Sequence, residues 1–297
     1  VTKNSMKILT IINPSAGQTK AQKSIKTLPG LYRRYNLEST ICISQSAEHV
    51  QQLAAQAVQD TYDIVAVCGG DGTLHHAING LQGSQTALGI LPMGSGNDLA
   101  GALGIPTNLD AACQILKQGH HRGLDLADTG RRVYACIAGV GLDSEVGKRT
   151  RHRPAWIRGK LIYPYAVLRS IFTFRPKFLR LIHDGGVFEG EILIAVVGNT
   201  RQYGGGMRIV PQADPEDGFL DVCIVRPMSQ WYLLKAFPSV FTGKHVSDPH
   251  VIVLRTQSVR LETHEPLEVF GDGEFLEQTP SQIKVRRNAL QVIAPGR

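Results

Sequence analysis

The sequence lacks the features that mark several large classes of protein. It contains no run of about 18 uncharged apolar residues, which is the length that a helix needs to cross a membrane. Its five cysteines stand far apart, and none has the C-x-x-C spacing of a zinc ribbon. Its glycines follow no Gly-X-Y period, which excludes collagen. We therefore expect a globular protein of a reducing compartment, and we assign it to the cytoplasm.

The chain is instead rich in glycine and in positive charge. Glycine accounts for 31 of the 297 residues, and the formal net charge at pH 7 is +7. A chain of this length forms about two domains on average. The charge favours an anionic partner such as a phosphate, a nucleic acid or an acidic membrane surface.

The hydrophobic pattern changes character along the chain. Early apolar runs predict strands at residues 7–12, 38–43, 64–68 and 88–91. Helical patterns lie at residues 18–28, 48–59, 74–81 and 98–103. The later residues predict short strands between glycine, proline and aspartate turns, two of them at 283–287 and 290–293, with helices at 161–172 and 229–241. We therefore predict an α/β plus β protein: a three-layer α/β domain at residues 1–126 and an antiparallel β-sandwich domain at residues 127–297.

A glycine-rich loop follows the third predicted strand and opens a helix. It consists of Gly69, Gly70, Asp71, Gly72 and Thr73. Glycines let a backbone approach a phosphate closely, and the free N–H groups at a helix start attract anions. Asp71 cannot bind a phosphate itself, so we expect it to meet a metal ion or to accept a proton. The alternative is an ordinary tight turn in which Asp71 caps the helix.

Two further loops are expected at the same edge of the sheet, because parallel strands end on one side. Residues 94–98 read Gly-Ser-Gly-Asn-Asp after the fourth strand, and residues 13–17 read Asn-Pro-Ser-Ala-Gly after the first. Alone, the former could be an ordinary loop capped by Asn97 or Asp98. Together the three loops predict a nucleotide site. The P-loop pattern GxxxxGK[ST] and the dinucleotide pattern GxGxxG are both absent.

The chain resembles a known family through five stretches in the same order. These are NPSAG, GGDGTLHHAING, LGILPMGSGNDLAGALGIP, GNTRQYGGGMRIVPQADPEDGFLDVCIV and FGDGEFL. They resemble the diacylglycerol kinase catalytic domain in its soluble bacterial lipid-kinase form, over nearly the whole chain. The resemblance implies an ATP- and Mg²⁺-dependent enzyme that phosphorylates a hydroxyl of a diacylglycerol-like lipid, with roles in phospholipid biosynthesis.

The resemblance also implies which residues bind ATP. Most lie in the three loops, and Ser44 matches a nucleotide-contacting position at the end of the second strand. The full set is Asn13, Pro14, Ser15, Ala16, Gly17, Ser44, Gly69, Gly70, Asp71, Gly72, Thr73, Leu74, His75, Ser95, Asn97 and Asp98. Ala16 stands where the family commonly has serine, and His75-His76 where it often has Asn-Glu.

The same resemblance implies the acidic machinery. Its network around Mg²⁺ would comprise Asp71, Asp98, Asp125, Asp217 and Asp272. A second Mg²⁺ would bind the Asp217 side chain and the carbonyl groups of Asp214 and Phe219. Glu274 would be the general base, with Asp71 and Asp272 as further catalytic residues. On the residues alone, Asp272 and Glu274 could instead belong to a surface hairpin turn, and residues 214–221 to a solvated acidic turn.

One segment is strongly basic. Residues 146–183 contain no Asp or Glu, and aromatic side chains alternate with the basic ones. Between residues 148 and 177 it carries nine basic residues, which are Lys148, Arg149, Arg151, Arg153, Arg158, Lys160, Arg169, Arg175 and Lys177. Such a segment suits the headgroup zone of an anionic membrane, so we expect peripheral membrane association. The alternative is a helix that packs on the sandwich. No nucleic-acid motif accompanies it, so we expect no nucleic-acid partner.

Two other functions stay open from the sequence. The chain could be another kinase with a GGDGT loop, such as an NAD kinase-like enzyme. It could also be a catalytically weak regulator that binds a lipid or a nucleotide. The oligomeric state stays open between a monomer and a homodimer.

Overall fold

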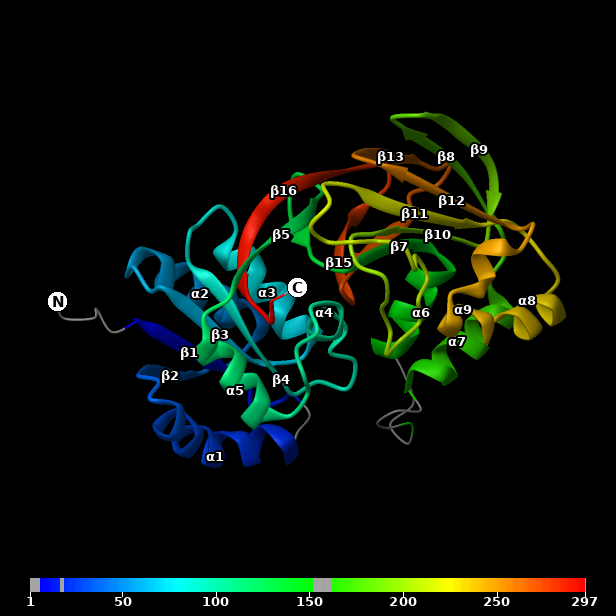
Figure 1. The fold of residues 1–297 in the computed structure, drawn as a ribbon. Coiled ribbons are helices and arrows are strands. Elements are labelled where there is room, and N and C mark those ends of the chain that lie inside the picture. The colour runs from blue at the N-terminus through cyan, green and yellow to red at the C-terminus, as the bar shows by residue number, and fades with distance from the viewer. Residues whose placement is uncertain (1–5, 17–18, 152–156, 158–161, 297) are drawn as a thin grey trace. The chain divides into compact units, whose positions relative to one another are not determined.

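The computed structural model describes residues 6–16, 19–151, 157 and 162–296. The chain divides into two compact units, which are both visible in Figure 1. Unit 1 comprises residues 1–126 and 287–297, and unit 2 comprises residues 127–286. The first part of unit 1 ends at Leu126, and unit 2 begins at Ala127. Unit 2 ends at residue 286, whereas the expected second domain covered residues 127–297. The difference arises because residues 287–297 return to unit 1.

Unit 1 is built from parallel strands and the helices between them. Its elements are β1 (Ile8–Ile12), α1 (Thr19–Tyr35), β2 (Ser39–Ile43), α2 (Ala47–Gln59), β3 (Ile64–Gly69), α3 (Asp71–Leu81), β4 (Ala87–Pro92), α4 (Asp98–Ala102) and α5 (Leu109–Gln118), after which β5 (His121–Asp128) leads into unit 2. The strand order is β2-β1-β3-β4, with parallel pairing throughout. Helix α2 packs against α3, and α1 against α5, and the two pairs lie on opposite sides of the sheet (Figure 1). Every residue of β1, β3 and β4 is buried, as expected for a parallel sheet covered on both faces.

Unit 2 is a β-sandwich with helices attached. Its elements are β6 (Val133–Tyr134), β7 (Ile137–Gly141), α6 (Leu142–Arg151), α7 (Ile162–Thr173), β8 (Lys177–His183), β9 (Gly186–Ile192), β10 (Ile194–Gly198), β11 (Leu220–Val225), α8 (Gln230–Ala236), α9 (Ser239–Thr242), the 3₁₀ helix η2 (Lys244–Ser247), β12 (Val251–Thr256), β13 (Ser258–Glu262), β14 (Glu268–Gly271), β15 (Glu274–Gln278) and β16 (Ser281–Ile293). One antiparallel sheet has the order β12-β11-β10-β7-β14-β15. The other places β13 between β16 and β8, with β9 beyond β8. Side chains from both sheets, such as Val197 and Leu181, form the core. The predicted fold class is confirmed.

Strand β16 explains why the chain returns to unit 1. The sequence predicted two short strands here, but the structure has one continuous strand. Its first residues pair with β13 in antiparallel fashion, and Val292 pairs with Leu88 of β4 in parallel. Asn288 interrupts the alternation with a φ of 48°, a left-handed conformation that asparagine tolerates better than most residues. The strand therefore completes the sheet of unit 1 after Asn288.

The helix expected at residues 229–241 is divided in two. Helix α8 ends at Ala236 and α9 begins at Ser239, with Pro238 between them. Proline lacks a backbone N–H and therefore cannot continue the hydrogen-bond ladder of a helix. Helices α6, α7 and α8 share a second hydrophobic cluster with Ile194 of β10. No helix within the described parts of the chain is long and apolar enough to cross a membrane.

Candidate active site

The loop after β3 and the loop after β4 contact each other through a pair of glycines. A Cβ on Gly94 would lie 2.7 Å from the Cα of Gly70, and a Cβ on Gly70 would lie 2.9 Å from the Cα of Gly94. Any side chain at either position would push the two backbones apart. From the sequence, these glycines are expected to let the backbone approach a phosphate. The structure adds a second reason, which is the contact between the loops.

Asp71 joins the same two loops by hydrogen bonds. Its Oδ1 accepts a bond of 2.8 Å from the backbone N–H of Asp98 and a longer one of 3.4 Å from that of Leu99. These N–H groups open α4. The cap of α3 itself is Gly70, which supplies no side-chain hydrogen bond. Asp71 therefore caps the following helix, and not its own helix as the sequence alternative suggested.

The carboxylates of Asp71 and Asp98 face the same small space. Their Oδ2 atoms lie 2.8 and 3.2 Å from the position that a Cβ on Gly96 would occupy. Asp98 is buried and Asp71 partly buried, so water screens their repulsion weakly. Two close carboxylates favour a bound cation, and Mg²⁺ prefers one or two carboxylates completed by water and phosphate oxygens. The donor set therefore fits Mg²⁺. Within the described residues, no three His, Cys, Asp or Glu side chains cluster to hold a metal ion.

The first loop is attached to the second. Nδ2 of Asn13 donates a 2.9 Å hydrogen bond to Oγ1 of Thr73, while Oδ1 of Asn13 accepts one from the N–H of Ser15. Ala16 N–H in turn bonds the carbonyl of Asn13. The loops after β1, β3 and β4 thus meet at the carboxyl edge of the sheet. Pro14 lies in the turn, and Gly17 lies outside the described residues.

The other residues expected to bind ATP have different surroundings. The hydroxyl of Ser44 bonds the carbonyl of Ile12 at the end of β1. Leu74 and His75 are buried inside α3, and Ser95 is exposed. Asn97 adopts a φ of 55°, and its amide donates to the carbonyl of Gly94, which closes the loop. Gly72, like Gly70, lies at the start of α3 and is partly buried.

Asp125 links strands β5 and β16 in unit 1. It is buried on β5, and its Oδ1 accepts a 2.7 Å bond from the N–H of Asn288 in β16. A Cβ on Gly123 would lie 1.9 Å from Oδ1 of Asn288, so a side chain at residue 123 would force the Asn288 side chain to move. The expected metal ligand therefore also holds the returning strand in register.

The acids near the end of the chain lie in a tight hairpin of unit 2. Asp272 and Gly273 connect β14 to β15, both with positive φ (53° and 82°), as in a two-residue hairpin turn. The Asp272 carboxylate accepts bonds of 2.9 Å from the N–H groups of Ala135 and Cys136. It therefore holds the hairpin against the segment that leads into β7. Glu274 begins β15 opposite Gly271 and is partly buried.

The turn expected to hold a second Mg²⁺ is compact. Oδ1 of Asp217 accepts a hydrogen bond from the N–H of Phe219. The backbone N–H of Asp217 donates a hydrogen bond to the carbonyl of Asp214. The other oxygen of Asp217 forms an ion pair with Arg255, so a metal ion at Asp217 would have to replace that partner. Asp221 lies beyond the turn, buried in β11 opposite Arg255. Burial raises the pKa of Asp221 to about 6, and Arg255 opposes this effect.

One carboxyl group of unit 2, that of Asp143, is not among the site residues expected from the sequence. Asp143 lies in the first turn of α6, where the hydroxyl of Tyr203 donates a 2.7 Å bond to its Oδ1. Its Oδ2 lies 2.4 Å from where a Cβ on Gly139 would be. Burial raises the pKa of Asp143 to about 6, and the Tyr203 bond works against this. The sequence feature that could have drawn attention to this contact is the glycine triplet that follows Tyr203. Its residues, 204–206, all have positive φ.

Fold and site together define a class: an α/β unit with acidic, glycine-rich loops in one chain with an antiparallel β-sandwich unit. Comparison with family models agrees. Residues 7–129 match the diacylglycerol kinase catalytic domain, and residues 136–294 match the YegS C-terminal NAD kinase beta sandwich-like domain.

Comparison with individual proteins gives the same result. A diacylglycerol kinase of Mycobacterium tuberculosis is 34% identical over 97% of this chain and 95% of its own length. One of Bacillus subtilis is 26% identical over 96% of this chain and 95% of its own. A crystal structure of a diacylglycerol kinase from Bacillus anthracis has the same fold, with a TM-score of 0.79, 24% identity and coverage of 98% and 97%. The chain belongs to the diacylglycerol kinase family.

Proposed function

We propose that this protein is an ATP- and Mg²⁺-dependent lipid kinase that phosphorylates a hydroxyl group of a diacylglycerol-like lipid. The observation that carries the proposal is the Asp71 carboxylate. It joins the loops after β3 and β4 and faces Asp98 across Gly96. Membership of the diacylglycerol kinase family supports the same reaction.

The loops of unit 1 have the chemistry to bind the phosphates of ATP. Asn13 and Thr73 fix the first loop to the second, and α3 begins with backbone N–H groups at residues that are partly accessible to solvent. Asp71 and Asp98 would hold Mg²⁺. The bound ion would neutralise the phosphate charge that resists attack by a hydroxyl oxygen.

Glu274 would act on the lipid hydroxyl. In the transfer, the hydroxyl oxygen bonds to the γ-phosphorus, the bond from that phosphorus to the ADP oxygen breaks, and the hydroxyl proton passes to the Glu274 carboxylate. Asp272 would act as a positioning residue, since it fixes the hairpin from which Glu274 projects.

The experiment is an assay with γ-labelled ATP, Mg²⁺ and a panel of acceptors, followed by thin-layer separation. The panel contains short-chain diacylglycerol, other lipid alcohols and NAD. We expect label in a lipid, and a loss of about 10²- to 10⁴-fold in kcat for Glu274→Gln. Glu277→Gln, on the same strand β15, is the matched control and should keep its activity. Label in NAD alone, or no transfer to any acceptor, would overturn the proposal.

The proposed setting is the cytoplasmic surface of a membrane that contains anionic lipid. A diacylglycerol-like substrate stays in the bilayer, so the enzyme has to work at the lipid surface. The basic segment at residues 148–177 is one support for this setting. Arg153, Arg158 and Lys160 of that segment lie outside the described residues.

A further inference from the structure

Two segments without acidic residues lie next to each other in unit 2. The first, residues 146–183, includes α7. The second, residues 222–247, also contains no Asp or Glu and includes α8, α9 and η2. Ala166, Val167 and Ile171 of α7 share a hydrophobic cluster with Leu233 and Leu234 of α8. Figure 1 shows α7, α8 and α9 gathered at one side of the unit. Two segments that are distant in the sequence thus pack together, and neither of them contains an acidic residue.

The outer side of this surface carries large exposed apolar groups. Trp231 of α8 is 77% exposed, Leu168 of α7 51% and Phe172 44%. Leu168 and Phe172 are one helical turn apart, and the Phe172 and Trp231 rings meet edge to face with centroids 6.3 Å apart. The three side chains therefore form one continuous ridge. An exposed tryptophan beside other apolar side chains marks a binding surface.

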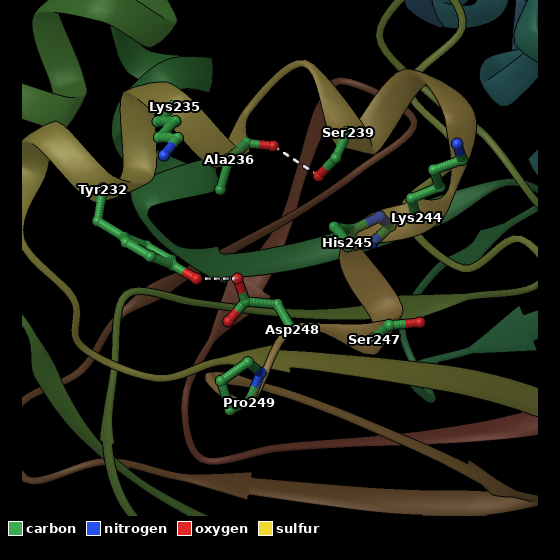
Figure 2. Close-up of a pocket in the computed structure, with 9 residues that line it drawn as sticks. All are labelled: Tyr232, Lys235, Ala236, Ser239, Lys244, His245, Ser247, Asp248 and Pro249. Carbon is green, nitrogen blue, oxygen red and sulfur yellow. Dashed lines mark hydrogen bonds between the residues drawn. The ribbon is translucent and has the colours of Figure 1, made fainter.

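Basic residues border this ridge. Lys235 lies one turn after Trp231 on the same face of α8, and Arg169 and Arg175 are exposed on either side of Phe172 in the sequence. Lys235 also lines a cleft of about 400 Å³ together with Lys244. In Figure 2 the two lysines lie at opposite ends of this cleft.

Among the described residues that line the cleft, Asp248 supplies the carboxylate, and both of its oxygens accept hydrogen bonds. Oδ2 of Asp248 accepts a 2.8 Å bond from the hydroxyl of Tyr232, as Figure 2 shows. Its Oδ1 accepts bonds from the backbone N–H and the ring of His250, and the backbone bond does most to lower the pKa of Asp248. Asp248 keeps its negative charge, so Lys235 and Lys244 leave the described lining of the cleft with a formal charge of +1, two lysines against one aspartate.

We infer that the ridge of Leu168, Phe172 and Trp231 and the cleft of Lys235 and Lys244 form a docking surface for an anionic bilayer. The ridge would enter the headgroup zone, where tryptophan is favoured, and the lysines would bind lipid phosphates. A second copy of the chain fits less well. A symmetric dimer would bring the same acid-free segments face to face, with like charges opposed and with the Asp248 carboxylate already bonded to Tyr232 and His250. The inference rests on the proposed function for its purpose, and it extends the expected membrane contact from residues 148–177 to α8.

The test is flotation of the full-length protein with vesicles of phosphatidylcholine, with or without phosphatidylglycerol. We expect binding only with phosphatidylglycerol, and a weakening as salt increases. Trp231→Ala and the double variant Lys235→Glu/Lys244→Glu should each lower the affinity about tenfold or more. Val187→Ala, an exposed apolar residue of β9, and Lys284→Glu, an exposed lysine of β16, are the matched controls and should bind normally.

A second measurement separates docking from catalysis. Trp231→Ala should phosphorylate dispersed short-chain diacylglycerol at the normal rate and lose activity only on vesicles. If no protein transfers phosphate but vesicle binding follows the expected pattern, the proposed function fails and the docking surface stands. Equal binding of Trp231→Ala and wild type, or equal binding to both vesicle types, overturns the docking surface. A dimer in sedimentation velocity that Trp231→Ala abolishes, without vesicle binding, assigns the ridge to a second copy and also overturns it.

Discussion

Asp71 has two roles in the structure, and a pair of substitutions separates them. Its Oδ1 caps α4 through the N–H of Asp98, and its negative charge faces the Asp98 carboxylate. Asp71→Ala removes both the cap and the charge. Asp71→Asn keeps an oxygen acceptor at the same place and removes the charge alone. A difference in stability between the two variants therefore reports the cap. A loss of activity or of the Mg²⁺ effect that both variants share reports the charge.

The magnitudes follow from these contacts. Loss of a capping side chain costs about 0.5–2 kcal/mol of stability, but relief of the repulsion between Asp71 and Asp98 offsets part of this cost. We expect Asp71→Ala to lose about 1 kcal/mol, equivalent to a fall of about 2–4 °C in Tm. We expect Asp71→Asn to unfold at or slightly above the temperature of the wild type. Amide hydrogen exchange at residues 98 and 99 should speed up only in Asp71→Ala.

Binding and turnover report the charge. Mg²⁺ should raise the Tm of the wild type and have little effect on that of either variant, because the ligand pair is broken in both. Both variants should lose at least about 10²-fold in kcat, since charge neutralisation is central to phosphoryl transfer. Wild-type turnover and an unchanged Mg²⁺ effect in Asp71→Asn would refute the reasoning and leave Asp71 as a cap alone.

Three further predictions concern other positions. Because the folded pKa of Asp143 is about 6 against an ordinary 3.8, its stability contribution is greatest at low pH and falls as pH rises through about 6. Asp143→Asn should therefore raise the free energy of unfolding by about 1–3 kcal/mol at pH 7.5. Denaturant titrations should also show a flatter dependence of that free energy on pH between about pH 4 and 6. An unchanged pH dependence would contradict a raised pKa at Asp143. Asp272→Asn keeps the positive φ but loses one backbone partner, so urea unfolding should show a loss of about 2–3 kcal/mol; no loss would mean that these bonds contribute little. Gly94→Ala should lose about 1–3 kcal/mol and raise KM for ATP, because its Cβ meets Gly70; Gly30→Ala, which meets nothing within 4 Å, should keep its KM.

The sheet of unit 1 could be predicted because its information is local. The runs in β1, β3 and β4 are almost entirely apolar, with Thr10 as the polar exception, and each ends in a loop rich in glycine or other turn residues. The rule that parallel strands end at one edge then brings the loops together without any knowledge of side-chain contacts. The division of the helix at Pro238 was also readable in principle, since proline stops the ladder of backbone bonds.

Pairings across long stretches of sequence could not be predicted in this way. Nothing near Asp272 shows that its carboxylate binds the N–H groups of residues 135–137, and nothing near Asp71 shows that it caps α4 rather than α3. The two short strands expected in β16 are one, because Asn288 supplies a left-handed residue that a periodicity count treats as a break. Such contacts depend on which distant backbone groups lack a partner, and the local pattern does not contain that information.

Three of the acids inferred from the family motifs share one structural property that affects how they can be tested. Asp71, Asp125 and Asp272 each accept hydrogen bonds from backbone N–H groups of another segment of their own unit. Removal of any of these carboxyl groups leaves a backbone donor without its partner, which costs stability whether or not a metal ion ever binds there. Lost activity in an alanine variant therefore cannot by itself identify a Mg²⁺ ligand. The asparagine variants are more informative, because they keep one oxygen acceptor and remove the charge, and a Mg²⁺ effect on Tm that survives at Asp125 or Asp272 but not at Asp71 would assign the ion to the loops after β3 and β4.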